Sequence, residues 1–231
     1  MTICLISMKH LVSNLPKGLD SEHYIYVPQH KMGVRDYQIL KGLNYQDTQD
    51  ALARDCLNLT PIKVFIDHLI NVRDAVIPRP KDRVPLHFVT GEKVGRRKAS
   101  ALWDYLSNDG NGAVWTHLNG KFRDINGDLH IITSHRLSRD VLLQMSQPVI
   151  YSLMNEGFVP LFHSAFNSQG LPIKSAEKQD YVHGETINFF PPSNGHVAGF
   201  ITNSHGAALY CHGSPAVPGI PRGVIPCAGG E

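Results

Sequence analysis

The amino-acid sequence predicts a mixed fold of helices and β-strands, in the α/β (α+β) class. One helical pattern and two strand patterns lead to this prediction. Apolar residues repeat at helical spacing from Ile62 to Ile70. Two strand-like runs flank Asn126-Gly127, a dipeptide that is typical of the turn of a β-hairpin. A further strand-like run, YVHGETINFF, covers residues 181–190.

The helix prediction has the strongest support between residues 60 and 76. The hydroxyl of Thr60 is a good cap for a first turn, and Pro61 suits the first helical position. The apolar spacing that follows predicts that this helix continues to about Val76. Spaced apolar residues between Asp36 and Leu57 predict a second helix.

The remaining segments are assigned from their local composition. A helix is predicted where Pro148 follows the candidate cap Ser146, and residues 78–85 (PRPKDRVP) are expected to form a rigid basic connector. The tail from His212 holds too much proline and glycine for regular structure; a surface tail is favoured over a lid or a partner-bound arm. The other predicted elements are strands at residues 1–12, 24–27, 86–90, 99–106, 118–122 and 129–134, and the helix at 148–154.

Length, composition and charge narrow the class of protein. A chain of 231 residues suggests one domain, with or without an appendage. With 42% hydrophobic and 18% charged residues it can bury a core. A net charge of +2 is too small to indicate nucleic-acid binding. Any anion site must therefore be built from locally placed arginines.

Cysteine and histidine usage indicates a reducing compartment and no metal. Cys4, Cys56, Cys211 and Cys227 form no CxxC pair, which favours reduced cytosolic thiols. Neither CxxC nor HExxH spacing occurs, so no metal is expected. No stretch approaches the ~20 apolar residues of a membrane span, and the first residues make a poor signal peptide. We expect a protein of the cytoplasm, of a cell or of an infected cell.

The segment richest in functional signals runs from residue 96 to residue 140. It reads RRKASALWDYLSNDGNGAVWTHLNGKFRDINGDLHIITSHRLSRD. The arginine side chain binds phosphate through parallel charge-assisted hydrogen bonds, so Arg96, Arg97 and Arg136 are candidate phosphate ligands. The alternative is that these arginines form salt bridges at an interface.

In the order and spacing of its residues this segment resembles the nucleotide-binding core of the thymidylate synthase and pyrimidine (dCMP, CMP) hydroxymethylase family. That family has a double arginine, a tryptophan, a Cys-His pair, a phenylalanine, a tight turn and a further arginine. The resemblance is specific over about 45 residues and extends more weakly to Met154. It implies a large mixed sheet backed by helices and a homodimer formed through the sheet. It divides the chain into a divergent part (1–58), a core (59–205) and a Pro/Gly-rich tail (206–231).

The resemblance also implies how a phosphate would be held. Arg136 matches the arginine that grips the nucleotide phosphate from within the subunit, with Ser138 as a hydroxyl partner. Arg96 and Arg97 match the pair that reaches the phosphate from the other subunit of the dimer. A pyrimidine mononucleotide is therefore the implied ligand.

The chain departs from the family where the family carries out its chemistry. Thr116 occupies the position of the nucleophilic cysteine, and a threonine hydroxyl is a poor nucleophile without an activating base. His117 matches the histidine beside the nucleophile, but adjacent side chains on a strand point to opposite faces. Asp140 matches the aspartate behind the substrate. The asparagine that reads the base falls near Pro148, for which Gln147 is a weak substitute.

These observations predict a protein that binds a dUMP- or dCMP-like nucleotide without cysteine-dependent synthase activity. One alternative is an active C5 one-carbon transferase, a methyl- or hydroxymethyltransferase, that uses a variant mechanism and a reduced folate such as methylenetetrahydrofolate. Another is a structural or regulatory oligomer that uses the fold as a scaffold. Neither a nucleic acid nor a membrane is expected as a partner.

Overall fold

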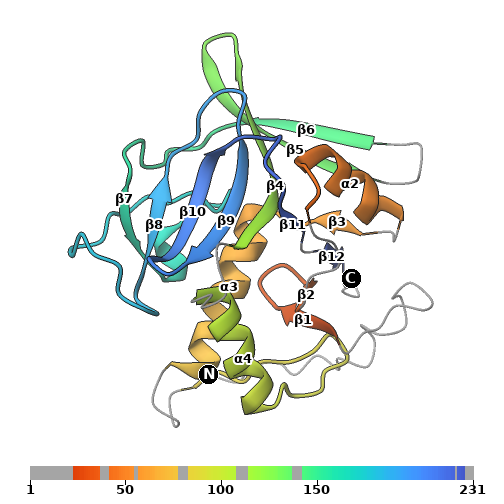
Figure 1. The fold of residues 1–231 in the computed structure, drawn as a ribbon, viewed down its shortest axis with the longest axis vertical. Helices are drawn as coiled ribbons and strands as arrows, with labels where there is room; N and C mark the ends of the chain where they lie inside the picture. Colours follow the sequence, from red (N-terminus) through yellow and green to blue (C-terminus); the bar gives the residue numbers. More distant parts are fainter. Residues whose placement is uncertain are drawn as a thin grey trace.

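The computed structural model describes residues 23–36, 42–54, 57–77, 83–107, 114–136, 142–221 and 223–226 (Figure 1). In these residues the chain forms a large mixed sheet, a small sheet and three α-helices. The prediction of a mixed α+β fold is therefore confirmed. The predicted strand at residues 1–12 lies outside the described residues.

The large sheet has the strand order β6-β5-β4-β9-β10-β8-β7. Its neighbouring strands are antiparallel except for β8 and β10, which are parallel. The short β11 (Ile220–Pro221) lies parallel to part of β4. The bounds of the other strands are β4 Val114–Ile125, β5 Asp128–Arg136, β6 Leu142–Pro148, β7 Gly157–Pro160, β8 Thr186–Phe190, β9 Val197–Asn203 and β10 Gly206–Gly213.

The predicted hairpin is present as β4 and β5. Asn126 and Gly127 at its turn have φ angles of 58° and 91°, the left-handed conformation that a two-residue hairpin turn requires. Both strands are longer than the sequence pattern predicted, and together they project beyond the rest of the sheet (Figure 1).

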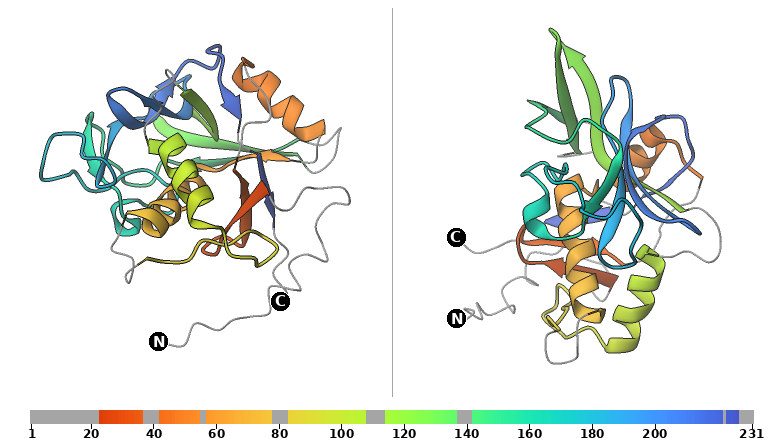
Figure 2. Two further views of the ribbon diagram at one scale, coloured as in Figure 1. Left: turned by 60° about the horizontal axis from the view of Figure 1, so that its bottom comes forward. Right: turned by 90° about the vertical axis from the view of Figure 1, so that its left-hand side faces the viewer.

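Two helices pack against the large sheet. The predicted helix is present as α3 (Ile62–Val76), and its Phe65 ring lies 4.9 Å from the Phe200 ring of β9. Helix α4 (Arg96–Ser107) lies alongside α3, as the right-hand view of Figure 2 shows. Among the described residues, no helix has the length and apolar character that crossing a membrane would need.

Helix α4 corrects a prediction, because a strand was expected at residues 99–106. Its buried residues include Ala99, Leu102, Trp103 and Leu106, whose spacing of three, one and three residues is that of a helix face. The strand expected at residues 86–90 is reduced to isolated bridges at His87 and Phe88.

The helix predicted at residues 148–154 is also absent. Pro148 ends β6, and residues 149–154 form neither helix nor strand. The side chain of Gln169 explains this conformation, because its amide nitrogen donates to the Pro148 carbonyl and its oxygen accepts from the Ile150 amide, each at 2.8 Å. These bonds engage the Pro148 carbonyl and the Ile150 amide, and the backbone there does not form a first helical turn.

The small sheet brings the two ends of the described chain together. Its order is β1 (Tyr24–Val27), β2 (Met32–Arg35), β12 (Gly223–Pro226) and β3 (Asn58–Leu59), with α2 (Tyr45–Arg54) between β2 and β3 in sequence. The strand at 24–27 and a helix between 36 and 57 were predicted. The tail was expected to lack regular structure, and that prediction is wrong, because β10, β11 and β12 all include tail residues. Their partner strands are distant in sequence, so local composition did not reveal them.

Candidate anion-binding site

Thr116 and His117 lie within β4, in the interior of the large sheet. Thr116 is paired with Phe200 of β9 on one side and with Ile220 of β11 on the other. Its side chain is 3% exposed and that of His117 is fully buried. A substrate that approached the Thr116 hydroxyl would have to displace this packing.

Both ring nitrogens of His117 are engaged. The indole nitrogen of Trp115 donates to His117 Nδ1 at 3.2 Å, and His117 Nε2 donates to the Leu43 carbonyl oxygen at 3.2 Å. Burial lowers the pKa of His117 below its usual value, which favours the neutral ring that these bonds require. His117 is therefore placed to hold residues 43 and 115 to the sheet rather than to activate Thr116.

The other residues predicted for the site are spread over the fold. Arg136 ends β5, where its backbone pairs with Leu142, and Gln147 lies exposed on β6. Ser138 and Asp140 lie outside the described residues, as does the side chain of Arg136. Within the described residues, no hydrogen bond or ion pair links the arginines that begin α4 to Thr116.

A cavity of about 240 Å³ lies beside the first turn of α4, and three cationic side chains line it: Arg83, Lys93 and Arg96. No carboxylate is among its described lining residues. The amino end of a helix adds partial positive charge to such a place. The rest of the wall is formed by Ala75, Val84, Pro85, Leu86, Val94 and Ala99. The cavity therefore presents positive charge over a mostly apolar wall.

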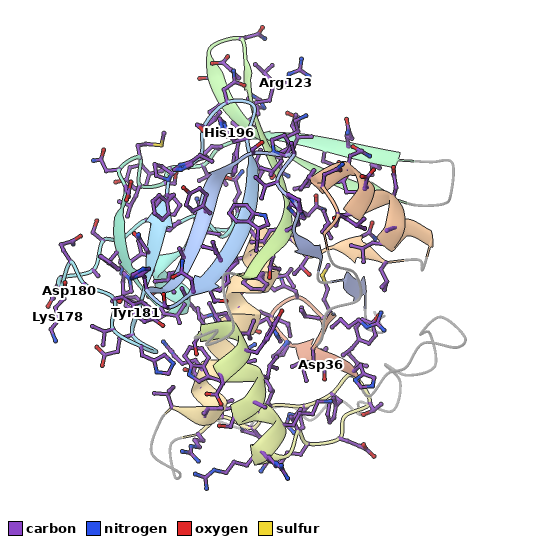
Figure 3. The ribbon with its side chains drawn as sticks, viewed as in Figure 1. Asp36, Arg123, Lys178, Asp180, Tyr181 and His196 are labelled. Carbon is purple, nitrogen blue, oxygen red and sulfur yellow. The ribbon has the colours of Figure 1, made fainter. Side chains whose placement is uncertain are left out.

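The three consecutive cations of α4 have different surroundings. Arg96 lines the cavity together with Ala99. Arg97, about 100° further round the helix, does not line it. The amino group of Lys98 lies 2.6 Å from the carboxylate of Asp36, which is labelled in Figure 3. Of the two arginines predicted to act as a pair, Arg96 lines the cavity and Arg97 does not.

His87 lies next to the cavity wall, and its pKa is lowered. It forms an isolated bridge with Lys93, and it follows Leu86 of the cavity wall. Burial and, to a smaller extent, the charge of Lys93 lower the pKa of His87 below its usual value. The smaller of these two effects shows that the charge of Lys93 acts on the ring of His87.

A second polar cluster, centred on Asp67 of α3, was not predicted from the sequence. The Asp67 carboxylate lies 2.7 Å from His30 Nε2, His163 Nδ1 and Lys63 Nζ. His163 belongs to the short helix η3 (His163–Ala165). Burial alone would raise the pKa of Asp67, but hydrogen bonds from His163, His30 and Lys63 outweigh it and hold the pKa well below its usual value. The four-residue spacing of Lys63 and Asp67 was the one local signal of this cluster.

Cys211 does not replace the missing nucleophile. It lies fully buried in β10, separated from β4 by β9, and burial raises the pKa of its thiol. In the described residues, no group of three or more histidine, cysteine or acidic side chains is placed to hold a metal ion. Of the residues predicted for the site, Arg96 is the one that the structure places in a cavity with other cations, so the cavity beside α4 is taken as the candidate anion site.

Comparison of the chain with protein-family models, with curated proteins and with solved structures finds no match.

Proposed function

We propose that this protein binds the phosphate group of a small nucleotide in the cavity beside the first turn of α4. The observation that carries the proposal is that Arg83, Lys93 and Arg96 line one cavity whose described wall has no carboxylate. Phosphate is the preferred partner of such a cluster, because arginine offers paired charge-assisted hydrogen bonds and lysine adds a compact charge.

The nucleotide proposed is a pyrimidine monophosphate of the dUMP or dCMP type. This choice rests on the resemblance of residues 96–140 to the thymidylate synthase and pyrimidine hydroxymethylase family, and a fold of that type belongs to the same proposal. At about 240 Å³ the cavity is smaller than the roughly 300–1,000 Å³ clefts that enclose drug-sized ligands. We therefore expect the phosphate to enter while the base remains at the rim near Val84, which is 56% exposed.

Binding without synthase chemistry is favoured over one-carbon transfer. A thiolate would have to come from a cysteine, and the cysteine among the described residues, Cys211, is buried with a raised pKa. Thr116 is also buried, and His117 has both ring nitrogens engaged. An active transferase that uses a reduced folate would need a nucleophile other than these described side chains.

The test is a thermal-shift titration with dUMP, dCMP, UMP, CMP and inorganic phosphate. A ligand at about 100 times its dissociation constant stabilises a protein by ~2.7 kcal/mol, which raises Tm by about 5–10 °C for a chain of this size. We expect phosphate and the nucleotides to raise Tm, and Arg96→Ala to abolish the shift. Absence of a shift with every ligand would overturn the proposal.

Arg97→Ala is the matched control, because it removes the same charge from the same helical turn outside the cavity. This variant should bind as the unmodified protein does. Equal losses in Arg96→Ala and Arg97→Ala would instead favour an arginine pair that acts across a subunit interface, as the sequence resemblance implies. A response to phosphate without preference among the nucleotides would retain the anion site and reject the pyrimidine assignment.

A further inference from the structure

Strand β6 forms one edge of the large sheet (Figure 1). It pairs with β5 on one side, and no described strand pairs with its other side. All residues from 143 to 148 are exposed. An edge strand of this kind presents unpaired backbone groups on which another strand can form.

The residues in and after β6 are unusually apolar for an exposed edge. No charged residue occurs between Val141 and Asn155, although natural edge strands usually carry charges that prevent pairing. Of the nine large hydrophobic residues exposed in the described chain, five lie in this segment. They are Leu143 (43% exposed), Met145 (40%), Ile150 (47%), Tyr151 (77%) and Met154 (59%).

The orientation of the β6 backbone follows from its pairing with β5. The amide of Val149 donates to the Leu129 carbonyl at 2.8 Å, so it points toward β5. Because backbone groups alternate in direction along an antiparallel strand, those of Gln144 and Ser146 point to the open side. The backbone nitrogen of Pro148 also faces the open side. Proline has no N–H to donate, so its presence there removes no hydrogen bond to β5.

We propose that a second copy of this chain pairs with β6 in antiparallel orientation, so that the two large sheets become one continuous sheet. The two-fold axis passes between Met145 of one copy and Met145 of the other. Gln144 then lies opposite Ser146 of the second copy, and the two exchange backbone hydrogen bonds on each side of the axis. Met145 lies opposite its own counterpart.

A second copy fits this edge better than an unrelated strand because the edge is complementary to itself. The sequence Leu142–Pro148 is uncharged, so antiparallel pairing of two copies brings no like charges together. The pairing also places each open amide of Gln144 and Ser146 opposite an open carbonyl, as an isologous two-fold contact requires.

Strand pairing alone buries too little surface for a stable dimer, which needs roughly 1,200 Å² or more in total. The exposed Ile150, Tyr151 and Met154 follow the strand directly in the sequence, and we propose that they supply the further apolar surface. This dimer differs from the one implied by the sequence resemblance, since it is built on β6 and not on Arg96 and Arg97. It does not depend on nucleotide binding.

The first test is the oligomeric state by sedimentation velocity across a range of protein concentrations. We expect a dimer for the unmodified chain and a monomer for Met145→Lys, in which two ammonium groups would meet at the axis. Val217→Lys is the matched control, because Val217 is 41% exposed and lies outside the β6 segment; this variant should remain dimeric. Far-UV circular dichroism establishes that each variant is folded.

The second test is disulfide cross-linking, which reads the register without disturbing the charge. At the axis the two Cα atoms of a non-hydrogen-bonded pair lie ~4.5 Å apart, within the range of a disulfide. Met145→Cys should therefore form a covalent dimer under mild oxidation, beyond any that the unmodified chain forms. Leu143→Cys should not, because two such residues would be separated by four residues along the strands, or roughly 14 Å.

Three results would overturn the proposal. A monomeric unmodified chain at every concentration would exclude the second copy, and protection of the Gln144 and Ser146 amides from hydrogen exchange in that monomer would assign the edge to another segment of the same chain. A dimer that persists in Met145→Lys would place the interface elsewhere. Equal cross-linking at positions 143 and 145 would reject the two-fold register.

Discussion

The Nδ1 atom of His163 lies 2.7 Å from the carboxylate of Asp67, although 96 residues separate them in the sequence. The same carboxylate accepts hydrogen bonds from His30, in the turn after β1, and from Lys63, one turn earlier in α3. One buried side chain therefore connects the small sheet, helix α3 and the segment that follows β7. Because the carboxylate is 2% exposed, its charge is stabilised by these three donors alone among the described residues.

We predict that Asp67→Asn destabilises the protein by about 2–4 kcal/mol. The amide keeps the shape of the side chain but removes the charge and turns one acceptor into a donor that faces other donors. The measurement is urea unfolding at pH 7. Asp128→Asn, at an exposed position in the β4–β5 hairpin, is the control and should change stability by less than about 0.5 kcal/mol. Equal effects of the two substitutions would mean that the three hydrogen bonds contribute little.

The free energy of unfolding should decrease in two steps as the pH is lowered. The pKa values of His117 and His87 are both lowered in the folded protein, so their contribution is complete above the unfolded value of 6.5 and is lost as the pH falls below it. The pKa of Asp67 is also lowered, so its contribution is present above the unfolded value of 3.8 and is lost below it. The urea midpoint, measured between pH 7.5 and pH 3, should show both losses.

The His117→Gln variant tests whether His117 causes the loss of stability between pH 7.5 and pH 5. His117→Gln should be less stable than the unmodified protein at pH 7.5, but its midpoint should change less between pH 7.5 and pH 5. If both proteins lose the same stability over that interval, the histidine responsible lies elsewhere in the chain.

We predict that Gly199→Ala destabilises the large sheet by about 1–3 kcal/mol. A Cβ atom at this position would lie 2.4 Å from Cζ2 of Trp115, a residue of β4. The indole ring would therefore have to move away from Gly199. The measurements are urea unfolding and near-ultraviolet circular dichroism, which responds to the packing of tryptophan. Gly95→Ala is the control for the added volume, because no atom lies within 4 Å of the added methyl group, and it should leave the near-ultraviolet spectrum nearly unchanged.

Binding of phosphate should raise the pKa of His87. An anion beside Lys93 offsets the positive charge that, together with burial, now lowers this pKa, and it thereby favours the protonated ring. An NMR titration of the histidine resonances with and without phosphate measures the change, and the His87→Gln variant assigns the resonance. Saturable phosphate binding that leaves the His87 resonance unmoved would place the anion away from this cavity.

The parts of the fold that were predictable depend on local signals. Helix α3 has a proline directly before its first turn and an apolar stripe within its own residues, and the β4–β5 hairpin has its turn sequence at Asn126-Gly127. The predicted cap at Thr60 is wrong, because Pro61 occupies the N-cap position and no side-chain hydrogen bond caps the helix. Helix α4 was mistaken for a strand, although its buried residues have helical spacing. Strands β11 and β12 were missed because their pairing partners lie about 100 or more residues away, where composition carries no signal.

The candidate site was predictable to a smaller extent. Arg96 was identified from the sequence, but the segment that contains Arg83 was predicted only as a rigid basic connector, and Lys93 had no recognisable pattern. The cavity forms because residues 83–96 fold back beside α3 and α4, an arrangement that a single sequence does not reveal. Asp67 was missed for a related reason, since His30 and His163 are 37 and 96 residues away.

The position of β12 has a consequence for synthesis of the protein on the ribosome. This strand, at residues 223–226, lies between β2 and β3, which belong to the first quarter of the chain. Strands β2 and β3 therefore emerge from the exit tunnel long before the strand that joins them has been translated. Until then β2 keeps an open edge, so the small sheet is completed only after residues 223–226 have been made, more than 160 residues after β3. We expect the nascent chain to be most vulnerable to misfolding and to chaperone capture during that interval.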